Sequence, residues 1–324
     1  MDLDLKDRKI LYELDLNCRQ SNAQIGKKVG LSRKVVEYRI KRMEDEGIIK
    51  GYYTCIDSYK LGYYFYRFYI NFQYVSSDLK NEIIKHFVNY KNISTVSTQK
   101  TMFDLVVVFW VNNINEFYDF WEKTLIKYGD YFAEQKFSLY IKGYGYPTSV
   151  LIMKNETTNL EEIETFGITK KYTIDKTDFD LLNILSLNAR ITTIELAKHL
   201  KSSSQTVTYR MNNLVKNGII QSFRVIFNYE KINLSRVKVD MYLKEHGRRY
   251  ELVRYIKSLP NLRYFSTSVG LCDLELEFLV KDSDELLLII ENIDRKFPGS
   301  MKKYNYYAGI RDYIESFMPK MEFK

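Results

Sequence analysis

The chain has 324 residues, with 45% hydrophobic and 28% charged residues, a formal net charge of +8 and a pI near 9.0. These values predict a soluble, folded protein. An internal repeat, described below, suggests two halves of about 160 residues, each large enough for two small domains. The positive charge favours a polyanionic partner, although a lysine-rich coding bias would give the same excess.

Cysteine usage and the N-terminus indicate a cytoplasmic protein. Cys18, Cys55 and Cys272 lie far apart and form no CxxC pair, which argues against a disulfide framework or a zinc site. The segment Met1–Asp4 lacks the pattern of a signal peptide. The longest apolar run, Leu105–Val111, is too short to span a bilayer and suits a buried strand. No membrane association is predicted.

The sequence contains an internal repeat. Residues 5–61 and 176–232 align without a gap at an offset of 171 positions. The repeat places Asn17 on Asn188, and Tyr38-Arg39 falls on Tyr209-Arg210. A duplicated unit can form a pseudo-two-fold object, and such objects read paired DNA half-sites.

Each half opens with the pattern of three helices. In the first half, apolar residues at helical spacing are followed by a capping box at Ser21 and Gln24. A turn at Gly30-Leu31 leads to Ser32, which caps a third helix that Gly47 ends.

The second half repeats this order. Its first helix covers Asp178–Leu187, Thr192 and Glu195 form a capping box, and Ser203 leads into a helix that Gly218 ends. In both halves an Ile-Ile pair and an aromatic-rich extended segment follow, which predicts a two-stranded wing in each half.

The remainder of each half alternates strands and helices in the order β-α-β-β-α-β. The expected elements are 66–75, 78–90, 93–99, 103–111, 114–128 and 134–142, and then 236–244, 248–258, 262–268, 272–280, 283–296 and 301–308. This order predicts a four-stranded antiparallel sheet with two helices on one face, so that burying the other face requires a second copy.

The predicted fold is therefore α+β, with two winged helix-turn-helix domains and two ferredoxin-like βαββαβ domains packed sheet to sheet as an intramolecular pseudo-dimer. The expected divisions are a winged helix-turn-helix at 1–62, a βαββαβ domain at 63–146, a connector at 147–172, and the second pair of domains at 173–234 and 235–324.

The third helix of the first half has the composition of a DNA-reading helix. Its cations precede the acidic tail Glu44-Asp45-Glu46, an order that opposes the helix dipole and so is not explained by helix stability. Arg and Lys can pair with phosphates or guanine edges, and Ser32 can donate to a phosphate. The predicted DNA contacts of this half are Ser32, Arg33, Lys34, Tyr38, Arg39, Arg42 and Lys50. The alternative is a solvated charged face on a core helix.

The second copy replaces most of these cations by neutral hydrogen-bonding groups. Gln and Asn can read adenine edges, so this head either has a different base preference or mainly supports the fold. Its predicted DNA contacts are Ser203, Ser204, Gln205, Thr206, Thr208, Tyr209, Arg210 and Asn213. Arg19 and Arg190 between the first two helices suit either a phosphate contact or a structural ion pair.

These motifs resemble the Lrp/AsnC (leucine-responsive, feast/famine) transcription regulators. The resemblance rests on Leu3–Leu11, Asn17-x-Arg19, Ile25–Ser32, Val36–Met43 and Glu46–Tyr52. It implies a DNA-binding regulator whose βαββαβ domains dimerise and bind a small effector such as an amino acid. The ordinary member is about half as long, so both protomers would be fused here, and further assembly of pseudo-dimers is expected. No cofactor and no metal site are predicted.

The family's Gly-x-x-Asp motif, near its effector pocket, is similar to Gly270–Asp273 in the second half. In the first half Thr101 replaces the glycine before Asp104. The residues predicted to bind an effector are Ser266, Ser268, Gly270, Leu271, Asp273 and Asp104. The alternative for Gly270 and Asp273 is a hairpin turn.

Two other functions remain open. One branch of the superfamily resembles sirohaem decarboxylases, which carry a His-containing stretch after the helix-turn-helix. The segments 52–69 and 223–239 contain no His, and His86, His199 and His246 have no matched spacing. The other possibility is an effector-sensing protein that has lost DNA binding.

Overall fold

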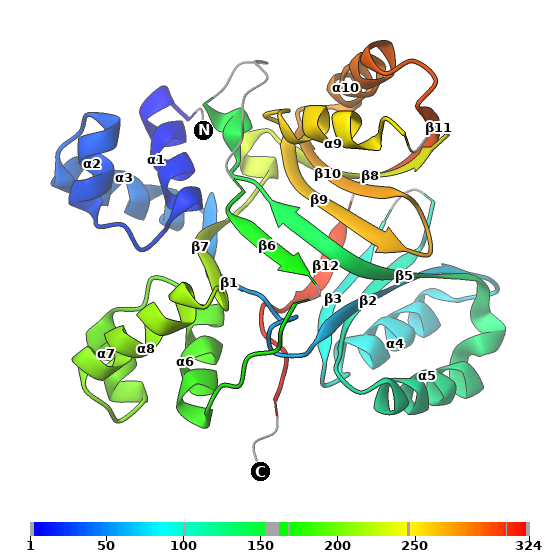
Figure 1. Cartoon of the computed structure of the whole chain (residues 1–324), viewed down its shortest axis with the longest axis horizontal. Helices are drawn as coiled ribbons and strands as arrows, with labels where there is room; N and C mark the ends of the chain where they lie inside the picture. The colour runs from blue at the N-terminus through cyan, green and yellow to red at the C-terminus, as the bar shows by residue number, and fades with distance from the viewer. Residues whose placement is uncertain are drawn as a thin grey trace.

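The computed structural model of the chain describes residues 3–99, 102–152, 162–167, 169–244, 247–308 and 310–321. Two helical heads lie side by side at one end, and the strands of both halves fill the centre with the remaining helices outside them (Figure 1). Within these residues no helix is both long and apolar enough to cross a membrane.

The heads form from the predicted three-helix patterns. Ser32 and Ser203 accept hydrogen bonds from the Val35 and Thr206 amides, so each caps a third helix as expected. Head 1 comprises α1 (Leu5–Leu16), α2 (Asn22–Val29) and α3 (Arg33–Asp45), and head 2 comprises α6 (Lys176–Leu187), α7 (Thr193–His199) and α8 (Ser204–Lys216).

The prediction of a two-stranded wing in each half is wrong. Each head contributes one strand, β1 (Ile49–Ile56) or β7 (Ile220–Phe227), and these two strands pair with each other in antiparallel register. After β1 the chain turns directly towards the next strand, and among the described residues β1 has no partner within its own half. The pairing with β7 satisfies the backbone groups that an isolated strand would leave exposed.

The βαββαβ pattern is confirmed in both halves. The first half contains β2 (Tyr64–Phe72), α4 (Ser77–Val88), β3 (Ile93–Thr98), β4 (Leu105–Val111), α5 (Ile114–Tyr128) and β5 (Phe132–Gly145). The second contains β8 (Ser235–Leu243), α9 (Arg249–Lys257), β9 (Leu262–Val269), β10 (Leu274–Val280), α10 (Ser283–Lys296) and β11 (Met301–Tyr307). The strand orders β5-β2-β4-β3 and β11-β8-β10-β9 are equivalent.

The two sheets are also joined edge to edge, which sheet-to-sheet packing alone does not predict. β5 pairs with β9 of the other half, for example Tyr144 with Phe265. A strand that the sequence did not reveal, β12 (Arg311–Glu315), follows β11 and pairs with β3 of the first half. Each half therefore ends by crossing to the other half. A further short strand, β6 (Glu164–Gly167), lies within the predicted connector and pairs with β5.

The hydrophobic cores of the heads contain residues of both halves. Val225 and Phe227 of β7 pack in the core of head 1, whereas Ile56 and Leu61 of the first half pack in the core of head 2. The exchange of strands thus fixes the heads to each other, and it fixes both heads to the joined sheets.

Candidate functional site

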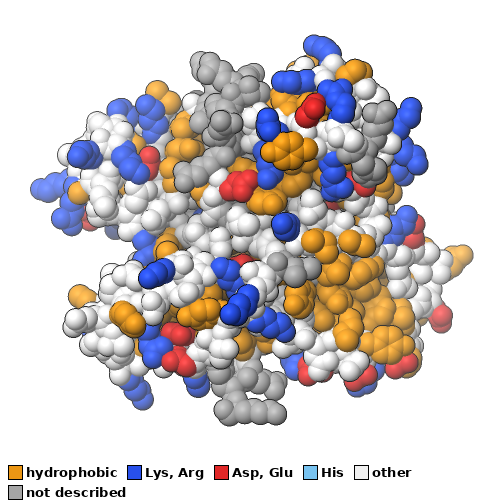
Figure 2. Space-filling view, viewed as in Figure 1, with side chains coloured by type: hydrophobic (Ala, Val, Ile, Leu, Met, Phe, Trp, Pro, Cys, Tyr) orange, Lys and Arg blue, Asp and Glu red, His pale blue; other side chains and the backbone are white. Residues whose placement is uncertain are grey.

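The N-terminal turns of α3 lie on the outer surface of head 1. Ser32, Arg33, Lys34 and Tyr38 are exposed, with 67% of Tyr38 accessible, and Lys50 at the start of β1 is exposed as well. Lys and Arg side chains gather at the edge of the molecule over α2 and α3 (Figure 2). This surface is available to a large polyanion.

Arg39 and Arg42 face back into head 1. Arg39 Nη1 lies 2.7 Å from Asp4 Oδ2 and 2.8 Å from Asp7 Oδ1, and Arg42 Nη2 lies 2.8 Å from Asp7 Oδ2. The hydrogen bond from Arg39 holds the pKa of Asp4 below its usual value. Both arginines therefore join α3 to the start of α1, a structural role that their positions on the helix did not indicate.

Head 2 presents a similar surface with fewer cations. Tyr209 is 66% exposed, and Ser203, Ser204, Gln205, Thr206 and Thr208 are exposed too, whereas Asn213 is half-buried. Arg210 Nη1 lies 2.8 Å from both Asp175 and Asp178, which repeats the arrangement of Arg39. Thr208 donates to the Ser204 carbonyl oxygen at 2.8 Å, so part of its hydrogen-bonding capacity is used within the helix.

The heads meet through Arg19 and Arg190. Arg19 Nη1 donates to the carbonyl oxygens of Ala189 at 2.7 Å and Ile191 at 2.9 Å, and Arg190 donates to Asn22 at 3.2 Å. The structure therefore places both arginines in contacts between the heads, where they hold α3 and α8 in a fixed relation.

The effector candidates of the second half have structural contacts. A Cβ added to Gly270, whose φ is +131°, would lie 2.3 Å from the carbonyl oxygen of Phe137 on β5. Asp273 accepts a hydrogen bond from the Leu243 amide at 2.8 Å, and Leu271 packs near Tyr69. These contacts account for Gly270 and Asp273 without a ligand, and an effector site around them stays a prediction.

The corresponding residues of the first half behave similarly. Asp104 accepts from the Phe72 amide at 2.9 Å, as Asp273 does at the end of β8. Thr101 lies outside the described residues. Ser268 is half-buried, and Ser266 lines an interior cavity.

That cavity lies between the inner faces of the two halves and has a volume of about 550 Å³. Arg67 of β2 and Glu275 of β10 meet beside it with 2.5 Å between Nη1 and Oε2, and both are buried. Glu275 also accepts hydrogen bonds from Ser138 at 2.9 Å and Tyr140 at 2.6 Å. Burial opposes the charge of Glu275, but Arg67 and these donors outweigh it and keep its pKa below the usual value.

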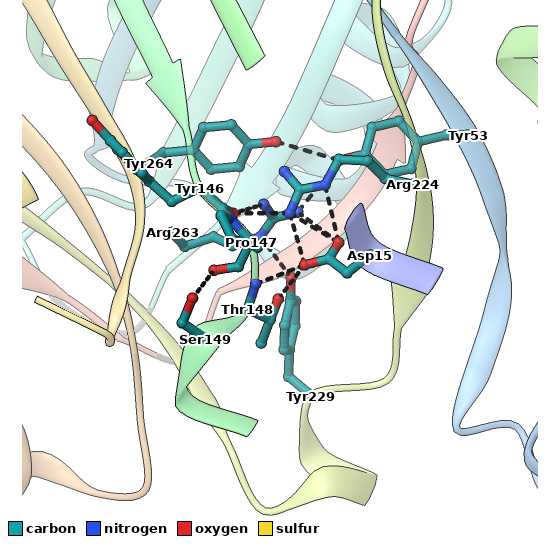
Figure 3. A network of polar contacts seen from close by, with 10 residues as sticks. All are labelled: Asp15, Tyr53, Tyr146, Pro147, Thr148, Ser149, Arg224, Tyr229, Arg263 and Tyr264. Atoms are coloured by element: carbon teal, nitrogen blue, oxygen red, sulfur yellow. Dashed lines mark hydrogen bonds and ion pairs between the residues drawn. The ribbon is translucent and has the colours of Figure 1, made fainter. Parts of the chain in front are cut away.

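A second buried network connects head 1 to the sheets (Figure 3). Arg224 of β7 donates to both carboxylate oxygens of Asp15 in α1, through Nε at 3.0 Å and Nη2 at 2.9 Å. Asp15 also accepts from the Thr148 amide and hydroxyl at 2.7 Å, and Arg263 Nη2 lies 4.0 Å away. Burial disfavours the charge of Asp15, yet the two guanidinium groups hold its pKa below the usual value.

The sequence did not identify these networks. For the network of Asp15 and Arg224 the visible signal was the difference between copies, since Ser186 stands where the repeat would place Asp15 and Tyr53 where it would place Arg224. A charged residue at a position where the other copy has an uncharged one indicates a contact that only one half makes.

The comparisons with known proteins agree with this architecture. Residues 3–50 and 174–221 match the family described as winged helix-turn-helix DNA-binding. An uncharacterised HTH-type transcriptional regulator of Pyrococcus furiosus is 28% identical over 149 residues, which cover 46% of this chain and 97% of that protein. Another uncharacterised HTH-type transcriptional regulator, from Pyrococcus horikoshii, is 31% identical over 129 residues, which cover 39% of this chain and 86% of that protein.

Two helix-turn-helix heads carried by two βαββαβ units define a DNA-binding regulator with both protomers in one chain. The chain belongs to the Lrp/AsnC family of HTH-type transcriptional regulators. Each relative aligns with less than half of the chain, as expected from a tandem duplication.

A solved structure similar over the whole chain is that of the siroheme decarboxylase NirDL. Its TM-score is 0.63 at 14% identity, and the match covers 98% of this chain and 94% of that one. This likeness shows that another protein has the same overall fold over almost the whole length of this chain. At this identity it indicates the fold alone.

Proposed function

We propose that the chain binds a specific double-stranded DNA sequence through α3 and α8 together. Both recognition helices lie on the same end of the molecule, as Figure 1 shows. Paired helices of this kind read half-sites about one helical turn, or a multiple of it, apart. Since the two helices differ in sequence, the expected operator is an imperfect palindrome.

One observation carries this proposal: the exposed turn Ser32–Lys34 at the start of α3. Within the described part of the chain, Arg33 and Lys34 have no ion pair with an acidic side chain. Two exposed cations at the N-terminal end of a recognition helix suit contacts with phosphates or with guanine edges. Arg39, Arg42 and Arg210 act mainly by positioning their helices, because each is bonded to an aspartate.

The repeat supplies matched variants for a test. A bound sequence is first selected from random DNA, and its affinity is then measured against salt for wild type and two double variants. Arg33→Ala/Lys34→Ala should reduce the slope of log affinity against log salt by about 2, roughly one for each lost phosphate contact. The equivalent pair in head 2, Ser204→Ala/Gln205→Ala, should leave the slope unchanged.

Equal losses of DNA affinity in the two double variants would contradict the proposal that the two heads contribute unequally to DNA binding. If wild type binds no selected sequence and shows no salt-dependent affinity, the chain is an effector-sensing protein that has lost DNA binding.

The effector and the assembly are further parts of the proposal. A small molecule such as an amino acid would act near Ser266, Ser268, Gly270, Leu271, Asp273 and Asp104, and pseudo-dimers would associate through the sheet domains. Light scattering at micromolar concentration tests the association, and a single pseudo-dimer would count against it. DNA affinity measured with each amino acid added tests the effector.

A second candidate is an enzyme similar to sirohaem decarboxylases, and the overall fold shared with NirDL favours it. Two histidines lie away from the interior cavity: His86 contacts Thr124 of α5 at 2.8 Å, and His199 ends α7. His246 lies outside the described residues. We infer a regulator without enzymatic activity. Absorption spectra of the protein incubated with sirohaem test this, because a changed spectrum with release of carbon dioxide would establish the enzyme.

A further inference from the structure

The second half has a strongly basic surface where α9, the end of α10 and the start of β11 meet. Residues 247–257 and 294–303 contain eight lysines and arginines but only two acidic residues. Lys and Arg side chains gather over these elements (Figure 2). Six exposed cations define this surface, which we call the basic end: Lys244, Arg248, Arg254, Lys296, Lys302 and Lys303.

Aromatic rings hold these cations in one cluster. Lys296 at the end of α10 lies over the ring of Tyr255 in α9, with 4.2 Å between Nζ and the ring centroid. Lys303 of β11 lies over the ring of Tyr242 in β8 at 4.5 Å. A ring attracts a cation without neutralising its charge, so these lysines are positioned and still available to an anion.

Most charges of the basic end have no acidic partner. Among the described residues of the chain, Arg248 is the one member with an ion pair, to Glu251 at 3.4 Å. Glu245, next to Lys244 in the sequence, lies outside the described residues. Cations that cluster without acids repel one another, so the cluster does not stabilise the fold. A surface of this kind attracts a polyanion.

The first half has the same fold without this surface. When the buried residues of the helices are aligned, its equivalent segments are 78–88 and 125–134, which contain three lysines and four acidic residues. Glu134 occupies the position on β5 that Lys303 occupies on β11. The βαββαβ fold therefore does not require a basic surface here.

The lysines at this end of the first half are also paired with acids. The three pairs are Lys127 with Glu82 at 2.9 Å, Lys136 with Glu134 at 3.0 Å and Lys80 with Asp104 at 3.6 Å. Lys80 and Lys127 contact rings as well, so the difference between the halves lies in the acids. The unpaired charge is a property of the second half alone.

The basic end lies on the same side of the molecule as head 1. Leu279 of β10 packs in the core of head 1, and Arg263 of β9 lies 4.0 Å from Asp15 of α1. In the view of Figure 1, head 1 lies above head 2, and α9 and α10 lie above α4 and α5. Head 1 also carries the exposed Arg33 and Lys34. DNA that continues past the half-site of head 1 would meet the basic end if it bends towards α9 and α10.

We propose that the basic end binds the phosphate backbone of double-stranded DNA that flanks the operator on the side of head 1. The proposal rests on the proposed function, because head 1 must first hold the operator. Exposed lysines that meet phosphates read no bases, so this contact depends on salt and on how easily the flanking DNA bends. DNA on the side of head 2 has no equivalent contact.

The test measures affinity against salt for three duplexes with the full chain. The first contains the selected operator alone, and the other two extend it by about 20 base pairs, two helical turns, on one side or the other. Hydroxyl-radical footprints of Arg33→Ala/Lys34→Ala identify the half-site of head 1. Extension on that side should raise the affinity about tenfold at low salt and steepen the slope of log affinity against log salt by about 3. Extension on the other side should change neither.

Two triple variants remove the same charge from the two halves. Lys296→Gln/Lys302→Gln/Lys303→Gln should bind the operator alone like wild type and lose the gain from the extension. Lys80→Gln/Lys127→Gln/Lys136→Gln should keep that gain. All six lysines lie on the surface of the sheet domains, and circular dichroism checks that both variants fold. If the first variant fails to fold, the footprint of wild type decides, because protection must extend beyond the operator on the side of head 1 only.

Equal affinity of wild type for the three duplexes would overturn the proposal and leave the regulator function intact. A gain on the side of head 2, or equal effects of the two triple variants, would also overturn it. If the basic end instead binds an acidic protein, its variant will bind every duplex like wild type, which again contradicts the proposal. Failure of wild type to bind the operator alone would refute the regulator function itself, and this inference with it.

Discussion

Replacing Asp15 by Asn should strongly destabilise the protein. Asp15 and Arg224 are fully buried, and the carboxylate accepts hydrogen bonds from Arg224 and Thr148. Asn has the same shape but turns an N–H₂ group towards donors, which leaves Arg224 and Arg263 without a counter-charge. Removing one partner of a buried ion pair costs about 3–5 kcal/mol.

The expected fall in thermal midpoint is on the order of 8 °C, at ~2 °C for each kcal/mol in a chain of this size. Urea unfolding gives the free energy directly, and calorimetry gives the midpoint. The control is Ser186→Ala at the equivalent position of the repeat, where the lost bond to Asn183 should cost about 1 kcal/mol.

Lowering the pH should remove the difference in unfolding free energy between wild type and Asp15→Asn. The native pKa of Asp15 lies below the ordinary value of 3.8, so its stabilising effect is complete above about pH 4 and decreases as pH falls through the native pKa. A second check is the double variant Arg224→Met/Asp15→Asn. Its loss of unfolding free energy should be less than the sum of the losses in the two single variants, because the two residues share one interaction. A cost below 1 kcal/mol for Asp15→Asn, or additive costs in the double variant, would show that the network does not hold the head to the sheets.

Three other predictions concern the backbone and a second buried acid. Lys201, with φ +49°, occupies the left-handed position where the first copy has glycine, so Lys201→Gly should raise the unfolding free energy by about 0.5–1 kcal/mol in urea. Gly270→Ala should lower it by about 3 kcal/mol, because the new Cβ meets the Phe137 carbonyl, whereas Gly129→Ala meets only ordinary contacts and should be nearly neutral. Burial, followed by the charge of Glu275, raises the pKa of Asp240 to about 7. Wild type should therefore lose stability relative to Asp240→Asn between pH 4 and pH 7, by at most about 1.4 kcal/mol for each pH unit, and a constant difference across this range would contradict the assignment.

Local signals in the sequence predicted the elements, and long-range contacts escaped prediction. Ser21 with Gln24 and Thr192 with Glu195 form capping boxes as expected, because both partners of each box lie within one helical turn. The pairing of β1 with β7 joins strands of different halves. It is made by backbone hydrogen bonds, which depend little on side-chain type, so the sequence did not show which strands would pair. β12 has a mostly exposed and charged pattern, so neither alternation nor hydrophobicity marked it as a strand.

The candidate site shows the same division. The exposed cations at the start of α3 followed from composition and from the cap at Ser32. Arg39 binds Asp4 and Asp7, which lie more than 30 residues earlier in the chain. The sequence pattern of a helix does not show whether an arginine on its surface faces solvent or a distant acidic side chain. The cavity between the halves requires both sheets and could not be inferred from either half.

The strand exchange between the halves also determines which combinations of heads can exist. If two separate protomers differed as these heads do, they would associate into three kinds of dimer, two of them symmetric. Because β1 meets β7 of the same polypeptide and the cores are shared, every molecule instead contains one head of each kind. Such a molecule has a direction, so it can distinguish the left side of a binding sequence from the right.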